Sequence, residues 1–357
     1  MKDLSVIIPI YNAEAHLEAL VATLVEQRVL GPEATIDAEV LLVDDGSTDA
    51  SARMIARIVS EYPAVVALRS NHGGPAEARN AGLAAASGKY VYLMDQDDYI
   101  VPGTLVRMLG VLAEHDADAV QFRYKPVRPC EVEEWRGREC ADAVEGVMTG
   151  VEFLVGDRLR WNMGLWNKLY SLDVIRRHGI AFDKAVCSYH EDDVFNYRYF
   201  LHSRRVACVD SVGYLWIQYP MSLSNNQSYA HKVRRQSEGR HLAAFFRDLH
   251  ASYKAEECSD ATLAHWFYDN YRWNMLAYWG FVLRMKCLSR RDAMRLVGEQ
   301  SRDGLLPVAG GFPRMGKGYP QGMSHRLMWA VVRRPMLLRM ALWLRLSKAA
   351  PEQTREK

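Results

Sequence analysis

The strongest constraint on the fold is an alternation, between residues 4 and 124, of short apolar runs with amphipathic segments. Residues 5–10 are rich in β-branched side chains, as expected of a strand that is buried on both faces. Residues 17–25 then place leucine and valine at the i, i+3, i+4 and i+7 spacing of one helix face. This alternation predicts an α/β fold in which helices cover both faces of a mostly parallel, Rossmann-like sheet.

The pattern recurs along the chain and predicts strands at 40–43, 65–68, 90–94 and 119–124. It predicts helices at 75–86 and 105–112, and another that follows Ser47, whose hydroxyl makes it the expected N-cap. Ligands of such sheets bind outside the carboxyl ends of the strands. We therefore expect the functional residues to follow the predicted strands.

Length and composition restrict the class of protein. The 357 residues suggest two domains at about 150 residues each. A hydrophobic content of 49% and a charged content of 25% are typical of a soluble globular protein and exclude a disordered or polytopic membrane chain. The net charge of +2 gives no general reason to expect a nucleic-acid partner.

Cysteine usage and the apolar segments predict a cytoplasmic protein. The six cysteines form no C-x-x-C pair and are expected to be reduced thiols. The first apolar stretch lacks the basic region and cleavage site of a signal peptide. No apolar run reaches the length of about 18 residues that a membrane-spanning helix needs, so none is expected.

The alternation is interrupted at residues 125–148, which contain two prolines and several acidic residues. We interpret them as an insertion within an N-terminal domain that spans residues 1–225. Residues 150–200 are expected to be mainly helical, and residues 206–218 extended. Residues 226–357 are expected to form a mainly helical region, whose aromatic residues between 245 and 281 are interpreted as core rather than as a sugar-binding surface.

The first acidic cluster follows a predicted strand. Asp44 and Asp45 come directly after VLLV and begin the string DDGSTD. Carboxylates at this position could accept hydrogen bonds from a nucleobase or a ribose. The alternative is that they organise a turn, since Asp, Gly and Ser are the residues that turns use.

A second cluster follows the run YVYLM and contains Asp95, Asp97 and Asp98 with no basic neighbour. Because like charges repel, a divalent cation is an economical way to hold three carboxylates together. In an extended segment Asp95 and Asp97 point to the same side. Mg²⁺ and Mn²⁺ prefer such oxygen ligands and leave positions for phosphate oxygens. The alternative is that these carboxylates cap the following helix.

A third cluster, Glu191, Asp192 and Asp193, lies near the start of a predicted helix. One of these carboxylates could take a proton from a reacting hydroxyl. The alternative is that negative charge here stabilises the helix through its dipole.

These clusters belong to an ordered set of motifs that resembles the family 2 glycosyltransferases of the GT-A fold. The motifs are SVIIPIYN at 5–12, VDDGSTD at 43–49, GGPAEARNAGL at 73–83, GKYVYLMDQDDY at 88–99 and HEDDVF at 190–195. The resemblance covers about residues 3–225 and implies that this part is a nucleotide-sugar-binding catalytic domain. It implies transfer from a nucleotide sugar, most simply a UDP-sugar, with Mn²⁺ or Mg²⁺ as cofactor.

The resemblance also implies roles for residues of the donor site. Pro9 and Tyr11 match the strand tip that receives the nucleobase, and Asp44 and Asp45 match the acidic pair that contacts uracil or ribose. Arg79, in the ARN segment, matches a residue near the donor.

For the reacting groups, the resemblance makes Asp97 the direct metal ligand and Asp95 its helper toward the ribose or the metal. Asp192 matches the general base, and the neighbouring Glu191 stays a candidate because three acidic residues follow one another. Lys168, in LWNKLY, could neutralise the diphosphate, or it could be a solvated surface lysine.

The implied reaction is a single displacement with inversion, which needs one base and no covalent nucleophile. The expected acceptor is a hydroxyl of a glycan or of a lipid-linked molecule. One alternative is an inactive sugar-nucleotide-binding scaffold in a polysaccharide assembly complex. A dinucleotide-dependent oxidoreductase is disfavoured because PIYNAEA stands where that class has G-x-G-x-x-G. The residues do not specify the donor sugar, the linkage or the oligomeric state.

Residues 325–348 interleave six cations with apolar side chains and contain no acidic residue. In one continuous helix, five of the six cations would lie within an arc of about 120°. Pro335 is expected to kink or split such a helix. The segment predicts either peripheral contact with an anionic membrane, at the inner face of the cell membrane, or packing on the catalytic domain or a partner helix.

Overall fold

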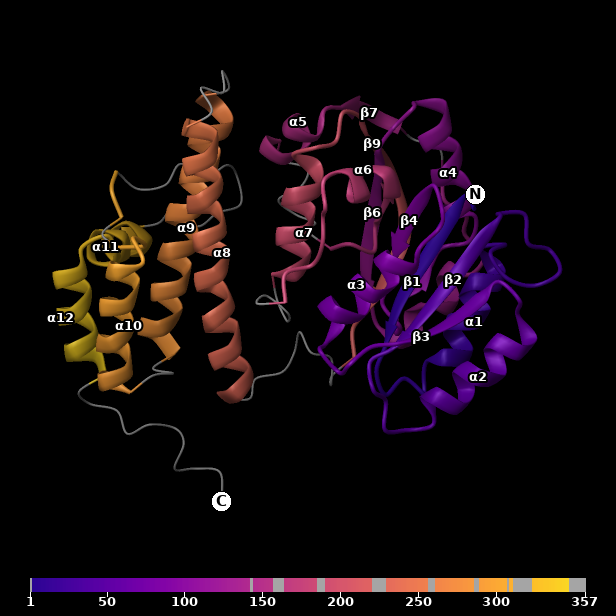
Figure 1. The fold of residues 1–357 in the computed structure, drawn as a ribbon, viewed down its shortest axis with the longest axis horizontal. Coiled ribbons are helices and arrows are strands. Elements are labelled where there is room, and N and C mark those ends of the chain that lie inside the picture. The colour runs from indigo at the N-terminus through magenta and orange to yellow at the C-terminus, as the bar shows by residue number, and fades with distance from the viewer. Residues whose placement is uncertain are drawn as a thin grey trace. The chain divides into compact units, whose positions relative to one another are not determined.

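The computed structural model describes residues 2–141, 144–156, 164–184, 190–219, 229–255, 261–285, 289–306, 308–310 and 323–346. The chain divides into two units (Figure 1). The first unit comprises Met1–Cys187 and Glu191–Asn225, and the second comprises Ser188–His190 and Asn226–Lys357.

The first unit is built on a nine-stranded sheet with the order β3-β2-β1-β4-β8-β6-β9-β5, in which β7 also pairs with β9. Four strands that the sequence predicts lie side by side and run parallel: β1 (Leu4–Ile10), β2 (Ala38–Asp44), β3 (Val65–Arg69) and β4 (Tyr90–Leu93). Their carboxyl ends therefore meet at one edge of the sheet. This edge carries the first two acidic clusters.

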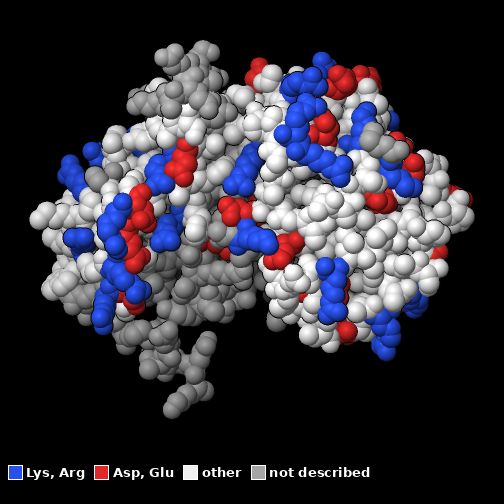
Figure 2. Space-filling model, in the orientation of Figure 1, with Lys and Arg blue, Asp and Glu red and all other residues white. Residues whose placement is uncertain are grey.

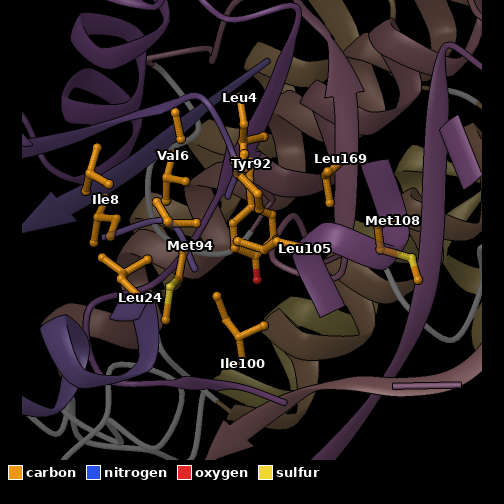
Figure 3. Packing of buried hydrophobic residues seen from close by; sticks show 14 of the residues in the cluster. Leu4, Val6, Ile8, Leu24, Tyr92, Met94, Ile100, Leu105, Met108 and Leu169 are labelled. Carbon is orange, nitrogen blue, oxygen red and sulfur yellow. The ribbon is translucent and has the colours of Figure 1, made fainter. Parts of the chain in front are cut away.

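Helices α1 (Leu17–Glu26), α2 (Ser51–Glu61), α3 (Pro75–Ala85) and α4 (Thr104–Glu114) follow these strands in the predicted places. Because side chains of a strand alternate between faces, β1 serves two cores. Val6 and Ile8 pack with α1 and α4 residues in the cluster of Figure 3. On the opposite face Ile7 lies so close to Gly82 of α3 that a Cβ there would come within 2.3 Å of the isoleucine.

The start of α2 differs from the prediction. Ser47 is not its N-cap: the helix begins at Ser51 after Ala50. The Ser47 hydroxyl instead accepts a hydrogen bond from the backbone N–H of Asn12 at 3.1 Å, in the loop after β1. The hydroxyl that resembled a helix cap therefore joins two strand ends.

The second half of the sheet is mixed, and it contains strands that the sequence did not predict. The strands are β5 (Tyr99–Ile100), β6 (Ala119–Val127), β7 (Val144–Met148), β8 (Lys168–Ser171) and β9 (Val206–Ile217). The expected insertion at 125–148 contributes the end of β6 and the whole of β7 to the sheet. It also contains two short 3-10 helices, η1 (Pro129–Glu131) and η2 (Glu133–Trp135).

The stretch 150–200 is not only helical. It contains α5 (Gly150–Val155), α6 (Leu172–Arg177) and α7 (Glu191–Phe200), but β8 lies between the first two and pairs antiparallel with both β4 and β6. A strand of four residues is too short to show a clear periodicity. Strand β9 confirms the extended segment predicted there.

The second unit is helical in the residues described, as predicted. Its helices are α8 (Tyr229–Ala255), α9 (Ala261–Met285), α10 (Arg290–Arg302), α11 (Met323–Val332) and α12 (Pro335–Leu346). The aromatic stretch supplies core, including the buried Phe246, Phe267, Tyr271, Tyr278 and Trp279. The chain is split at Pro335, which starts α12, where its fixed φ and missing N–H are tolerated.

None of the described helices is long and apolar enough to cross a bilayer. Cys130, Cys140 and Cys208 are free thiols. The other three cysteines, at 187, 258 and 287, lie outside the described residues.

Candidate functional site

The loops after β1 and β2 are joined by hydrogen bonds that involve residues 47–51. Thr48 N–H donates to Asn12 Oδ1 at 2.8 Å, and Ala13 N–H donates to the Ser51 hydroxyl at 2.8 Å. Together with the bond to Ser47, these contacts explain why two distant motifs both carry small polar residues. They hold Pro9, half-buried near the end of β1, and the exposed Tyr11 that follows.

Asp44 and Asp45 act in the structure as organisers of turns. Asp44 Oδ1 accepts from the Ser47 N–H at 2.9 Å. Asp45 accepts from the N–H groups of Gly73 and Gly74 at 3.1 and 2.8 Å, and from the Ser70 hydroxyl. Both residues are buried, so the turn interpretation that the sequence left open describes their contacts. Their contact with a nucleoside stays a prediction.

Tyr11 presents an aromatic surface at the tip of β1. Its side chain is 44% exposed, and its ring lies 5.0 Å from that of His72. The Gln96 side chain receives a hydrogen bond from the Tyr11 N–H at 2.8 Å and donates one to the Tyr11 carbonyl at 3.1 Å. Sequence reasoning missed His72 and Gln96. Only their positions, beside the Gly-Gly-Pro turn and between two aspartates, hint at a role.

The centre of the site is Arg79 of α3, whose side chain is buried. Its guanidinium lies 2.8 Å from Asp95 Oδ1 and 3.5 Å from both Glu191 Oε1 and Asp192 Oδ1. Burial alone would lower the pKa of Arg79, but the charges of these three carboxylates hold it above its ordinary value. The structure thus joins the second and third acidic clusters around a cation from a third motif.

The segment of the second acidic cluster is a turn, so the same-side placement that holds for an extended segment does not apply to Asp95 and Asp97. Asp98 is buried, and it accepts hydrogen bonds from the Tyr214 hydroxyl at 2.6 Å and the Ile217 N–H at 2.7 Å, so it holds β9. Asp97 has a different environment: burial and the neighbouring charge of Asp95 raise its pKa to about 6. Asp95 has no basic neighbour in the sequence, but in the structure the cation of Arg79 lies beside it.

In the part of the chain that the structure describes, no three His, Cys, Asp or Glu side chains form a group that could hold a metal ion. Asp97 still fits a cation that takes its other ligands from phosphate and water. Its half-buried carboxylate has a raised pKa. A divalent cation would offset both the desolvation of this carboxylate and its repulsion by Asp95. Mg²⁺-type sites commonly use one or two carboxylates together with substrate phosphates.

Asp192 lies at the start of α7, and a quarter of its side-chain surface is exposed. Burial of the carboxyl raises its pKa, as do the charges of Glu191 and Asp95, while Arg79 acts in the opposite direction. A carboxylate with a raised pKa is a better proton acceptor near neutral pH than an ordinary aspartate. The dipole of α7 also favours acidic residues here, and the role of Asp192 as a base stays a prediction.

Lys168 is fully buried in β8, so the interpretation as a solvated surface lysine was wrong. Its Nζ donates to the Gly164 carbonyl at 2.6 Å and to Asn167 Oδ1 at 2.9 Å. Burial lowers its pKa to about 7, and the charge of Asp192 partly opposes this. These contacts hold the Lys168 amino group inside the sheet, and its neutralisation of a diphosphate stays a prediction.

Residues 5–173 match the sequence profile of glycosyl transferase family 2. The chain is 28% identical over 234 residues to the uncharacterized glycosyltransferase YibD of Escherichia coli, a match that covers 62% of this chain and 63% of YibD. It is 28% identical over 217 residues to the poly(ribitol-phosphate) β-N-acetylglucosaminyltransferase TarS of Staphylococcus aureus, covering 60% of this chain and 35% of TarS. The matches thus span less than two thirds of the length of either relative.

Among solved structures, S. aureus TarS 1–349 in complex with UDP-GlcNAc resembles this chain with a TM-score of 0.52 at 20% sequence identity. The similarity covers 89% of this chain and 98% of that one. It shows that the fold is of the GT-A type, with a helical C-terminal part.

Proposed function

This chain is a member of glycosyltransferase family 2, and on that premise we propose that it transfers a sugar from a UDP-sugar to a hydroxyl of a glycan or lipid-linked acceptor, with inversion. The observation that carries this proposal is the meeting of Asp95, Glu191 and Asp192 around Arg79 at the carboxyl edge of the sheet. Free thiols at Cys130, Cys140 and Cys208 support a cytoplasmic setting.

We assign the nucleobase to the tip of β1. The exposed ring of Tyr11 offers a stacking surface beside Pro9, and the hydrogen bonds of Asn12 with Ser47 and Thr48 tie its loop to the loop after β2. The solved complexes of TarS with UDP-GlcNAc and with UDP support uridine as the nucleoside.

We assign the diphosphate end to the turn that carries Asp97 and Asp95. Asp97 would hold Mn²⁺ or Mg²⁺, with Asp95 helping from its position beside Arg79. When bound, such a cation stabilises the negative charge that grows on the departing diphosphate. Because that charge is largest in the transition state, the stabilisation accelerates the reaction.

We assign the acceptor side to the start of α7. The hydroxyl oxygen attacks the anomeric carbon opposite the leaving group, and Asp192 takes its proton as the new bond forms. One displacement inverts the configuration at that carbon. Arg79 contacts the Asp192 carboxylate and is itself held by Glu191 and Asp95.

The raised pKa of Asp97 predicts a pH dependence of metal binding. A carboxylate binds a cation only when it has lost its proton, and Asp97 has a pKa of about 6. We therefore expect the affinity for Mn²⁺ to fall about tenfold per pH unit below pH 6, and to be nearly constant well above it. Calorimetric titration with MnCl₂ on both sides of pH 6 measures this. Asp97→Asn should remove both the binding and its pH dependence, and a pH-independent affinity in the wild type contradicts the assignment.

The donor is tested by thermal unfolding with a panel of nucleotide sugars, each with and without Mn²⁺. A ligand that binds only the folded state raises the melting temperature. We expect UDP-sugars to stabilise the protein in a Mn²⁺-dependent way and GDP- or CMP-sugars to have little effect. Stabilisation by UDP-sugars without any transfer to glycan acceptors would favour the alternative, an inactive scaffold that binds the donor.

A further inference from the structure

Helices α11 and α12 have an apolar surface on two opposite sides. Their inner sides are buried in the second unit and comprise Trp329, Val332, Leu338 and Leu342. These positions explain why the two helices pack on their neighbours α9 and α10. An ordinary amphipathic helix would present only polar side chains on its other side.

The outer sides are apolar as well. Of the eleven large hydrophobic residues that are exposed among the described residues, six lie between 323 and 346. In α12 they are Met336, Met340, Trp343 and Leu344, at the i, i+4, i+7 and i+8 spacing of one stripe. In α11 they are Met323 at 78% and Leu327 at 63% exposure, one turn apart. A concentration of this kind marks an interaction surface.

Cations accompany the exposed apolar residues. Arg326 and Arg334 are exposed on α11 and just beyond it, and Arg339 is exposed on α12 between Met336 and Met340. No acidic residue occurs between 325 and 350. Figure 2 shows basic and acidic side chains interspersed over one face of the molecule. The split at Pro335 means that the arc calculated for one continuous helix does not apply, and Arg345 and Lys348 lie outside the described side chains.

We propose that the outer sides of α11 and α12 dock on the surface of an anionic lipid bilayer. Methionine, leucine and tryptophan side chains would enter the interfacial region, where tryptophan is favoured. Arginines would lie at the level of the headgroups and pair with their phosphates. A protein partner or a second copy would also cover apolar side chains, but the arginines among them match anionic lipid specifically. The inference concerns binding alone and does not depend on the proposed transfer reaction.

The test is co-sedimentation of the full chain with vesicles of phosphatidylcholine alone and of phosphatidylcholine mixed with phosphatidylglycerol, at low and high salt. We expect sedimentation with the anionic vesicles at low salt and much less at high salt or with the neutral vesicles. Replacing Arg326, Arg334 and Arg339 together by glutamine should reduce the partition coefficient roughly a hundredfold. Met336→Ser with Met340→Ser should reduce it at least about tenfold, also at low salt.

A matched control is Val66→Ser with Val106→Ser, which removes two exposed apolar side chains from the first unit and should leave partitioning unchanged. Circular dichroism and melting curves check that every variant is folded. The proposal is overturned if the wild type ignores anionic vesicles, or if the arginine and methionine variants partition like the wild type. It is also overturned if the wild type is a dimer that the methionine variant dissociates, because a second copy would then cover this surface.

Discussion

Asp192→Asn is expected to lower the transfer rate by about 10²- to 10⁴-fold, the usual contribution of a general base, while UDP-sugar binding stays close to that of the wild type. Asparagine keeps the size of the side chain but cannot take the proton of the acceptor hydroxyl. Initial rates with saturating donor, together with calorimetric titration of UDP, separate the two effects. Loss of donor binding in parallel with the rate would instead make Asp192 a donor-site residue.

Asp193→Asn is the matched control, since it makes the same change of charge one residue further along α7. It should change the rate little, because the carboxylates that contact Arg79 from this helix belong to Glu191 and Asp192. If Asp193→Asn or Glu191→Gln loses the rate and Asp192→Asn does not, the base is one position away from our assignment.

The same residue predicts the acidic limb of the pH profile. Burial raises the pKa of Asp192 above its ordinary value, and only the deprotonated form can accept a proton. The transfer rate should therefore decrease about tenfold per pH unit below that pKa. The residual activity of Asp192→Asn should lack this limb.

Arg79→Met is expected to destabilise the fold by about 3 kcal/mol at neutral pH, near the lower end of the cost of breaking a buried ion pair. The substitution leaves three carboxylates around an apolar side chain. The cost stays at the lower end because the side chain of Asp95 is 34% exposed and water can screen it. Unfolding in urea at fixed pH measures the change.

The pH dependence of this loss has a definite sign. Burial raises the pKa of Asp192 against the opposing charge of Arg79, so removing the guanidinium raises this pKa further above its unfolded value. The folded variant then binds more protons than the unfolded chain, so its deficit relative to the wild type should shrink as the pH falls toward the unfolded values of about 4. A deficit that is constant with pH would mean that lost packing, and not charge, is the cause.

Arg57→Met provides the control for Arg79→Met. Arg57 also pairs with a carboxylate, Glu18, but both side chains are mostly exposed. Its loss should cost less than about 1 kcal/mol, as is usual for surface ion pairs. Arg79→Lys keeps the charge without the planar fork and should fall between the wild type and the methionine variant.

The first half of the sheet could be predicted because its strands and helices are long enough to show their periods. Strands β1 to β4 and helices α1, α3 and α4 lie where the alternation placed them. Strand β8 was not predicted, because a strand of four residues, three of them buried, between two short helices shows no period of its own. The prediction that Ser47 is an N-cap was wrong because the sequence does not distinguish a hydroxyl that bonds a neighbouring loop from one that caps a helix.

For the site, the rule that ligands bind at the carboxyl ends of strands located the acidic residues but not their partners. The pairing of Arg79 with residues more than 100 positions away, Glu191 and Asp192, leaves no local pattern. The burial of Lys168 was equally hidden, since lysine is usually exposed. The assigned roles of these residues stay predictions for the experiments above.

The position of Gln96 between Asp95 and Asp97 has a mechanical consequence. Its side-chain amide forms hydrogen bonds with both the backbone N–H and the backbone carbonyl of Tyr11. One side chain thus fixes the separation between the proposed nucleobase platform and the proposed cation ligands, which lie at the two ends of a single donor molecule. The length of the Gln96 side chain would thus determine which length of nucleoside diphosphate fits between the two ends of the site. The side chain of Gln96→Asn is one methylene shorter and would be too short to make both hydrogen bonds to Tyr11.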